Sequence, residues 1–134
     1  MIKLKGRVIV AGRVEGEALV SAQPLSFYGG VNPETGVIVE KGHMLQGAKV
    51  SGKILVFPYG KGSTVGSYVL YAMAKYGTAP KAILNREAEP IVVVGCILAK
   101  IPLADKFNLD PVENLKTGDM VRLWEDGRIE GWKP

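Results

Sequence analysis

The chain has 134 residues, of which 47% are hydrophobic and 22% are charged, and its formal net charge is +4. This length suits one domain with a modest core, and the composition excludes a disordered chain. The longest apolar run, residues 91–99, is too short to span a bilayer, and the N-terminus lacks a signal-peptide pattern, so we expect a cytoplasmic protein that does not bind membranes.

The first third of the chain predicts short strands joined by glycine-rich turns. Residues 6–10 and 15–21 have strand patterns, and residues 36–40 predict a third strand. Residues 22–36 between them are rich in Pro, Gly, Asn and Ser, which indicates a long loop. Long ordered loops in compact domains are uncommon and often functional, so this loop is a candidate binding segment.

The middle third predicts a strand, a turn, a helix and a second strand. Residues 53–57 are almost entirely apolar, which favours a central strand buried on both faces. A helix should cover residues 64–76 and end at Gly77, and residues 79–85 predict the next strand, in a right-handed parallel crossover. The buried face of this helix should carry Val65, Val69, Ala72, Met73 and Tyr76.

The last third contains one ambiguous segment and one clear hairpin. In residues 90–99 the three valines favour a strand, whereas Pro90, the acidic residues before it and the length of the segment favour a buried helix. Asp126-Gly127 joins two alternating segments, which predicts a C-terminal hairpin. We therefore expect residues 1–134 to form one β-rich α/β domain with two main helices.

The ionisable residues limit what this chain can do alone. Cys96 is the single cysteine and lies in an apolar run, which predicts a buried thiol and fits neither a disulfide nor an iron–sulfur cluster. His43 is the single histidine, which disfavours a zinc site. The lysines and arginines are scattered without aromatic interleaving, so no nucleic-acid partner is predicted, while the positive charge suits a small anionic substrate.

The turn at residues 60–64, Gly-Lys-Gly-Ser-Thr, is the strongest candidate site. It is not a P-loop, because Gly62 follows Lys61, and it is not a nucleophile elbow, because Gly62 adjoins Ser63. One explanation is that Ser63 or Thr64 caps the helix. The flanking glycines and the amides at a helix start also suit an anion, which leaves a carboxylate, a phosphate or a Ser63 alkoxide open.

Three segments together resemble the small subunit of the aconitase X family. They are "GRVEGEALVSAQPLSFYGGVNPETG", "FPYGKGSTVGS" and "YGTAPKAILNREAEPI", followed by a "TGDMVRL" tail, in the same order over residues 6–123. The resemblance implies the swivelling β/β/α domain of aconitases. It also implies a large partner subunit that carries a [4Fe-4S] cluster, which acts as a Lewis acid on the departing hydroxyl.

The resemblance implies a hydro-lyase subunit that is active only with its large subunit. The implied reaction converts (R)-5-phosphomevalonate to its trans-anhydro product in the archaeal mevalonate pathway. Related dehydratases of hydroxyproline or isopropylmalate are the nearest alternatives. A phosphohistidine carrier of the same shape would need a histidine at position 63, and an RNA-binding domain would need a stacking platform that is not visible.

The resemblance also implies roles for single residues. "YGKGST" resembles the Tyr-Gly-x-Gly-Ser-Ser turn of aconitases, which implies that Ser63 is the base that removes a proton beside a carboxylate. Aconitases continue with Arg-Glu-His, whereas this chain has Val65-Gly66-Ser67. The difference implies either another substrate or a carboxylate clamp from elsewhere, with Lys61, Arg86 and Arg13 as the candidates, and it disfavours isopropylmalate. The expected substrate-binding residues are Lys61, Gly62, Thr64, Arg86, Ser26, Gly29, Gly30 and Asn32. For Arg86 the alternative is an ion pair with Glu87 or Glu89.

Overall fold

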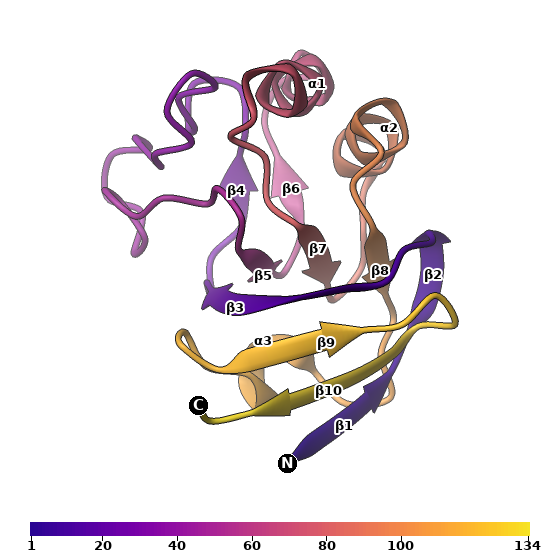
Figure 1. Cartoon of the computed structure of the whole chain (residues 1–134). Helices are drawn as coiled ribbons and strands as arrows, with labels where there is room; N and C mark the ends of the chain where they lie inside the picture. The colour runs from indigo at the N-terminus through magenta and orange to yellow at the C-terminus, as the bar shows by residue number, and fades with distance from the viewer.

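An eight-stranded sheet organises the chain, and the structure, a computed structural model, describes all 134 residues (Figure 1). The strand order is β1-β10-β9-β3-β5-β7-β8-β2, and a second sheet contains only β4 and β6. The strands are β1 (Ile2–Lys5), β2 (Arg7–Val10), β3 (Val14–Val20), β4 (Leu25–Ser26), β5 (Ile54–Phe57), β6 (Gly60–Lys61), β7 (Ala82–Asn85), β8 (Leu103–Asp105), β9 (Met120–Leu123) and β10 (Arg128–Trp132). The helices are α1 (Gly66–Tyr76), α2 (Pro90–Ala99) and α3 (Pro111–Asn114).

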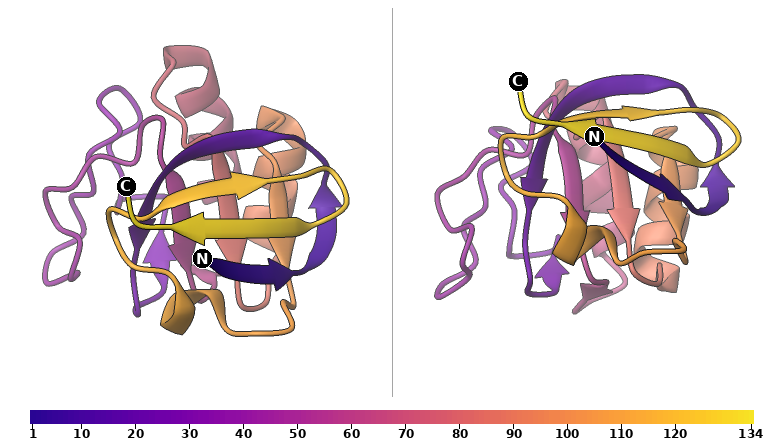
Figure 2. Two further views of the ribbon diagram at one scale, coloured as in Figure 1. Left: turned by 60° about the horizontal axis from the view of Figure 1, so that its bottom comes forward. Right: turned by 90° about the horizontal axis from the view of Figure 1, so that it is seen from below.

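The sheet curls because its two edge strands are consecutive in the sequence. β1 and β2 stand at opposite ends of the strand order, yet only Gly6 separates them. The Gly6 N–H donates to the Gly127 carbonyl at 3.0 Å, which ties this corner to the β9–β10 hairpin (Figure 2). β3 pairs antiparallel with β9 and parallel with β5, so the antiparallel and parallel halves form two layers. The helices α1 and α2 add the third layer, which confirms the expected β/β/α fold.

Two cores separate these layers, and β5 contributes to both. Leu55 and Phe57 pack toward α1 and α2, whereas Ile54 and Val56 pack inside the curled sheet. This alternation follows from the opposite orientation of successive side chains in a strand. All four residues are fully buried, which confirms the prediction of a central strand.

Helix α1 begins two residues later than predicted, and its buried face differs from the expected one. Its buried residues are Gly66, Ser67, Leu70 and Met73, whereas Val65 and Tyr76 are exposed. The cause is the neighbouring helix α2, since a Cβ on Gly95 would lie only 2.5 Å from Leu70 Cδ1. The close approach at Gly95 fixes which side of α1 faces inward.

Residues 90–99 form a helix, as their length indicated. Both carboxylate oxygens of Glu89 accept backbone N–H groups of the first turn, from Ile91 at 2.8 Å and Val92 at 2.9 Å. None of the helices is long and apolar enough to cross a membrane.

Some predicted boundaries are wrong. The segment 36–40 is not a strand, because Val37 bridges to Lys49 while Ile38 bridges to Val31, so no continuous ladder forms. β7 begins at Ala82 instead of residue 79. The sequence patterns also missed β1, β8 and the short helix α3. The C-terminal hairpin of β9 and β10 is confirmed.

Candidate active site

The glycine-rich turn and the long loop lie side by side. β6 forms the first two residues of the turn, and it pairs in parallel with β4 in the register Leu25↔Gly60 and Ser26↔Lys61. The chain therefore brings together two segments that the sequence predicted separately. The turn follows β5, and Arg86 follows β7, so both belong to the carboxyl edge of the parallel strands, where α/β sheets place their ligands.

Ser63 is exposed, and its hydroxyl lies just before α1. The Ser63 Oγ accepts a hydrogen bond from the backbone N–H of Val65 at 3.1 Å. Neither Ser63 nor Thr64 is the helix cap, because the N-cap position is Val65 and no side chain caps it. A backbone donor and the positive end of an 11-residue helix therefore face this oxygen, an arrangement that stabilises negative charge on it.

Lys61 is held by an acidic residue that the sequence patterns did not single out. Its Nζ lies 2.9 Å from Glu40 Oε2, while Glu40 Oε1 accepts the backbone N–H of Ser26 at 3.1 Å. Burial favours the neutral form of Glu40, but the hydrogen bonds from Lys61 and Ser26 outweigh it and hold the pKa of Glu40 below its ordinary value. Glu40 thus connects the loop to the turn and orients the Lys61 ammonium.

The three glycines of the predicted site differ in their local surroundings. Gly62 has a φ of +89°, and a Cβ there would lie 2.5 Å from Ser26 Oγ. A Cβ on Gly30 would overlap the Ser26 carbonyl oxygen. Gly29 has a φ of +81°, and a Cβ there would meet no other atom within 4 Å, so open space adjoins it at the loop surface.

Asn32 lies away from this cluster. Its side-chain oxygen accepts the backbone N–H of Glu34 at 2.9 Å and shapes a local turn. The next residue, Pro33, accepts a hydrogen bond from Thr78 Oγ1 at 2.6 Å, just beyond the end of α1. Since α1 is about 16 Å long, Asn32 and Ser63 lie near opposite ends of this helix.

Arg86 forms an ion pair, but with a partner that the sequence did not indicate. Its Nε donates to Asp110 Oδ2 at 2.8 Å. Glu89 is occupied as the cap of α2, and Glu87 lies 3.7 Å from Lys106.

Arg13, the other candidate for a carboxylate clamp, precedes the amino end of β3. The candidate turn follows the carboxyl ends of the parallel strands, so Arg13 belongs to the opposite edge. The structure therefore brings Lys61, Gly62, Ser26 and Gly30 together around the turn, and it does not add Arg13 to them.

The side chains of this chain do not fit an iron–sulfur cluster. No group of three or more His, Cys, Asp or Glu residues gathers at a possible metal position. Cys96 is fully buried between α2 and the sheet, and burial raises the pKa of its thiol far above the ordinary value. His43 is also buried, with Nδ1 accepting the Leu45 N–H at 3.0 Å and Nε2 donating to the Pro24 carbonyl at 3.0 Å.

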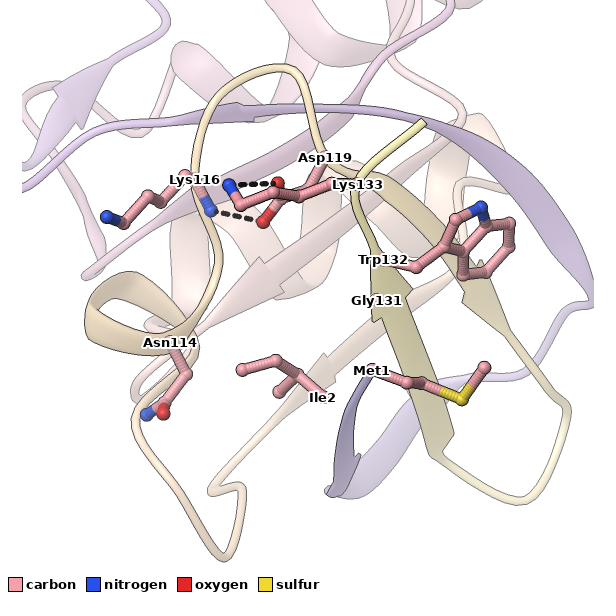
Figure 3. A pocket seen from close by; sticks show the side chains of 8 residues that line it. All are labelled: Met1, Ile2, Asn114, Lys116, Asp119, Gly131, Trp132 and Lys133. Carbon is pink, nitrogen blue, oxygen red and sulfur yellow. Dashed lines mark hydrogen bonds and ion pairs between the residues drawn. The ribbon is translucent and has the colours of Figure 1, made fainter.

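An apolar hollow of about 280 Å³ adjoins the turn. It lies between α1 and α2, and Thr64, Tyr68 and Val94 are among its lining residues. Another hollow, of about 490 Å³, lies beside the two termini (Figure 3). There Asp119 already pairs with the Lys116 N–H at 2.9 Å and with Lys133 Nζ at 3.5 Å, and no predicted site residue lines the hollow.

Comparisons with known proteins by sequence profile, by sequence identity and by structure all find similarity to the same family. The sequence profile of the aconitase X swivel domain matches residues 3–131. The phosphomevalonate dehydratase small subunit of Methanosarcina acetivorans is 55% identical, over 99% of this chain and 93% of the relative, and that of Pyrococcus furiosus is 56% identical, over 96% and 95%. A crystal structure of Thermococcus kodakaraensis aconitase X in its holo-form superposes with a TM-score of 0.93 at 51% identity, covering 99% of this chain and 100% of the other.

Proposed function

The chain belongs to the aconitase X swivel domain family, and on that basis we propose that it is the small subunit of a phosphomevalonate dehydratase whose base is Ser63. The observation that carries the proposal is the exposed Ser63 hydroxyl, which accepts the Val65 N–H at the amino end of α1 in a turn like that of aconitases. The two relatives above share more than half of their residues with this chain over nearly their whole length.

In the proposed reaction, Ser63 removes a proton from the carbon next to the substrate carboxylate. A serine hydroxyl is an intrinsically poor base, so its ionised form needs strong local stabilisation. The Val65 N–H and the dipole of α1 provide part of it, whereas the Lys61 ammonium, two residues before Ser63, is already paired with Glu40 at 2.9 Å. A partner that covers the exposed turn would exclude water and strengthen each of these interactions.

We propose that the [4Fe-4S] cluster belongs to a large subunit. This chain offers one buried cysteine and no group of metal ligands, so its residues do not fit a cluster. Bound to the partner, the cluster would supply Lewis-acid chemistry to the heteromer. The contribution of this chain is then the serine, its electrostatic environment and part of the substrate pocket.

The surface that we assign to the large subunit is the apolar outer face of α1 and α2. Helix α2 is apolar all round, yet only one side of it is buried here. Such a helix is normally covered on all sides, and large exposed apolar patches mark interaction sites. This face begins at the hollow beside Thr64, so a partner that reaches Ser63 also reaches it. Its exposed residues are Tyr68, Tyr71, Val94, Ile97 and Leu98.

Reconstitution with a cluster-bearing large subunit tests the proposed function. Each subunit alone should leave (R)-5-phosphomevalonate unchanged, and the complex should release its anhydro product. Hydroxyproline and isopropylmalate, offered to the same complex, identify a related dehydratase if one of them is the better substrate. A complex that dehydrates none of these acids contradicts the proposal.

A further inference from the structure

A polar hollow of about 300 Å³ lies beside Lys61, and neither the reaction chemistry nor the family comparison assigns it a role. No hydrophobic residue lines it. Its charged and polar side chains include Gln23, Glu40, Lys41, His43 and Lys61, and we call it the lysine hollow.

The lysine hollow offers hydrogen-bond donors, and its one carboxylate is already engaged. Lys41 is exposed and forms no ion pair, so its ammonium is available to a ligand. The side-chain oxygen of Gln23 accepts the Met44 N–H at 2.8 Å, which leaves the amide NH₂ group as a donor. Glu40 is the one carboxylate, and the Lys61 ammonium and the Ser26 N–H already occupy its two oxygens.

The buried His43 lines the lysine hollow with an imidazole ring whose two nitrogens are both engaged in hydrogen bonds. His43 Nδ1 accepts the Leu45 N–H, so it carries no proton, and Nε2 donates to the Pro24 carbonyl. Counting two lysines and one glutamate, the hollow has a net charge of +1. Ammonium and amide donors around a polar space are the groups that bind a phosphate.

We propose that the lysine hollow binds the phosphate of the substrate, with Lys41 as the main contact and Lys61 joining the hollow to Ser63. This proposal rests on the proposed function for the identity of the substrate. Lys61 stands two residues before Ser63, and two residues span at most about 7 Å. In phosphomevalonate, the phosphate and the carbon that loses the proton lie on opposite sides of the carbinol carbon, so an extended molecule reaches from Ser63 into the hollow.

Replacing one lysine of the loop tests the proposal in the reconstituted complex. Lys41→Met should raise the KM for phosphomevalonate about tenfold or more, because one charge-assisted contact is lost, with kcat changed less than twofold. Lys49→Met is the matched control, since Lys49 is exposed in the same loop, forms no ion pair and does not line the hollow. Mevalonate, which lacks the phosphate, should bind both variants as it binds the wild type when measured as a competitive inhibitor.

The outcomes separate the two proposals. Equal KM values for Lys41→Met and Lys49→Met overturn the phosphate site while leaving the dehydratase intact. If the wild-type complex does not act on phosphomevalonate, the proposed function fails. The phosphate site is then tested separately, by titrating the chain with inorganic phosphate and following its backbone amide signals by NMR. Amide shifts centred on Lys41 that vanish in Lys41→Met support it. The absence of shifts, or equal shifts in both proteins, rejects it.

Discussion

The backbone of Gly62 packs so tightly against Ser26 that a methyl group on Gly62 would lie 2.5 Å from the Ser26 hydroxyl oxygen. This contact joins the glycine-rich turn to a residue 36 positions earlier in the chain, and the Lys61–Glu40 ion pair joins it to a residue 21 positions earlier. The position of Ser63 therefore depends on a long-range packing contact as well as on the local turn.

Gly62→Ala should lower both stability and activity. At a φ of +89° an alanine costs about 1 kcal/mol. Displacing the Ser26 hydroxyl, which donates to the Tyr28 carbonyl at 3.0 Å, adds about 1 kcal/mol. Gly47→Ala is the matched control, because Gly47 has the same φ and open space around it. Urea unfolding of the two variants measures the difference, and equal losses would show that the contact with Ser26 has no energetic effect.

Ser63→Ala should lower kcat by roughly 10²–10⁴-fold, the usual contribution of a positioned base. The side chain is exposed, so the free energy of unfolding should change by less than about 0.5 kcal/mol. Thr64→Ala is the comparison, since no hydrogen bond holds the neighbouring Thr64 side chain, and its main effect should be on KM. Steady-state kinetics of the complexes measure both, and normal turnover by Ser63→Ala rejects the serine as the base.

Glu40→Gln should destabilise the chain by about 1 kcal/mol at neutral pH, because the charged contacts to Lys61 and the Ser26 N–H weaken. The pKa of Glu40 is lowered by folding. Its carboxylate therefore adds stability above the unfolded pKa of about 4.3, and this stability is lost as the pH falls through the lower folded pKa. The stability gap between wild type and variant should close on acidification. Glu34→Gln, at an exposed position without an ion pair, should show no such gap.

Ile97→Lys should weaken association with the large subunit without unfolding this chain. The Ile97 side chain is 57% exposed on the outer face of α2, so the lysine is tolerated in the free chain but places a charge in an apolar interface. Leu109→Lys is the matched control, at 49% exposure in the loop before α3. Titration calorimetry with the large subunit compares them. Normal binding by Ile97→Lys refutes this docking face, and loss of a homodimer in sedimentation assigns the face to a second copy instead.

Cys96 should resist alkylation in the folded chain at about pH 8 and react once urea unfolds it. The thiolate is the reactive form, and burial raises the pKa of this thiol while blocking access. Because the folded state disfavours the thiolate, stability should fall as the pH rises above the ordinary thiol pKa of about 8.5. Iodoacetamide labelling followed by mass spectrometry measures the reaction. Rapid labelling of the native chain would show that the α2 core opens readily.

Local sequence patterns correctly predicted the elements that are determined by neighbouring residues. The apolar run of β5, the Asp126-Gly127 hairpin and the α2 segment beginning at Pro90 were identified because turn chemistry and periodicity act on neighbouring residues. The short strand β8 and residues 36–40 were not predicted correctly. Their states depend on which distant strand lies beside them, and a local pattern does not contain that information.

Local composition and family motifs were sufficient to identify the β/β/α class, the glycine-rich turn and Ser63 as the candidate base. Which residues share a site was settled only by the folded chain. In the folded chain, Lys61 pairs with Glu40, and Ser26 packs against Gly62. Asn32 lies near the other end of α1, and Arg86 pairs with Asp110. The physical reason is that side-chain pairs across a fold depend on strand order and helix packing, which arise from contacts between residues far apart in the chain.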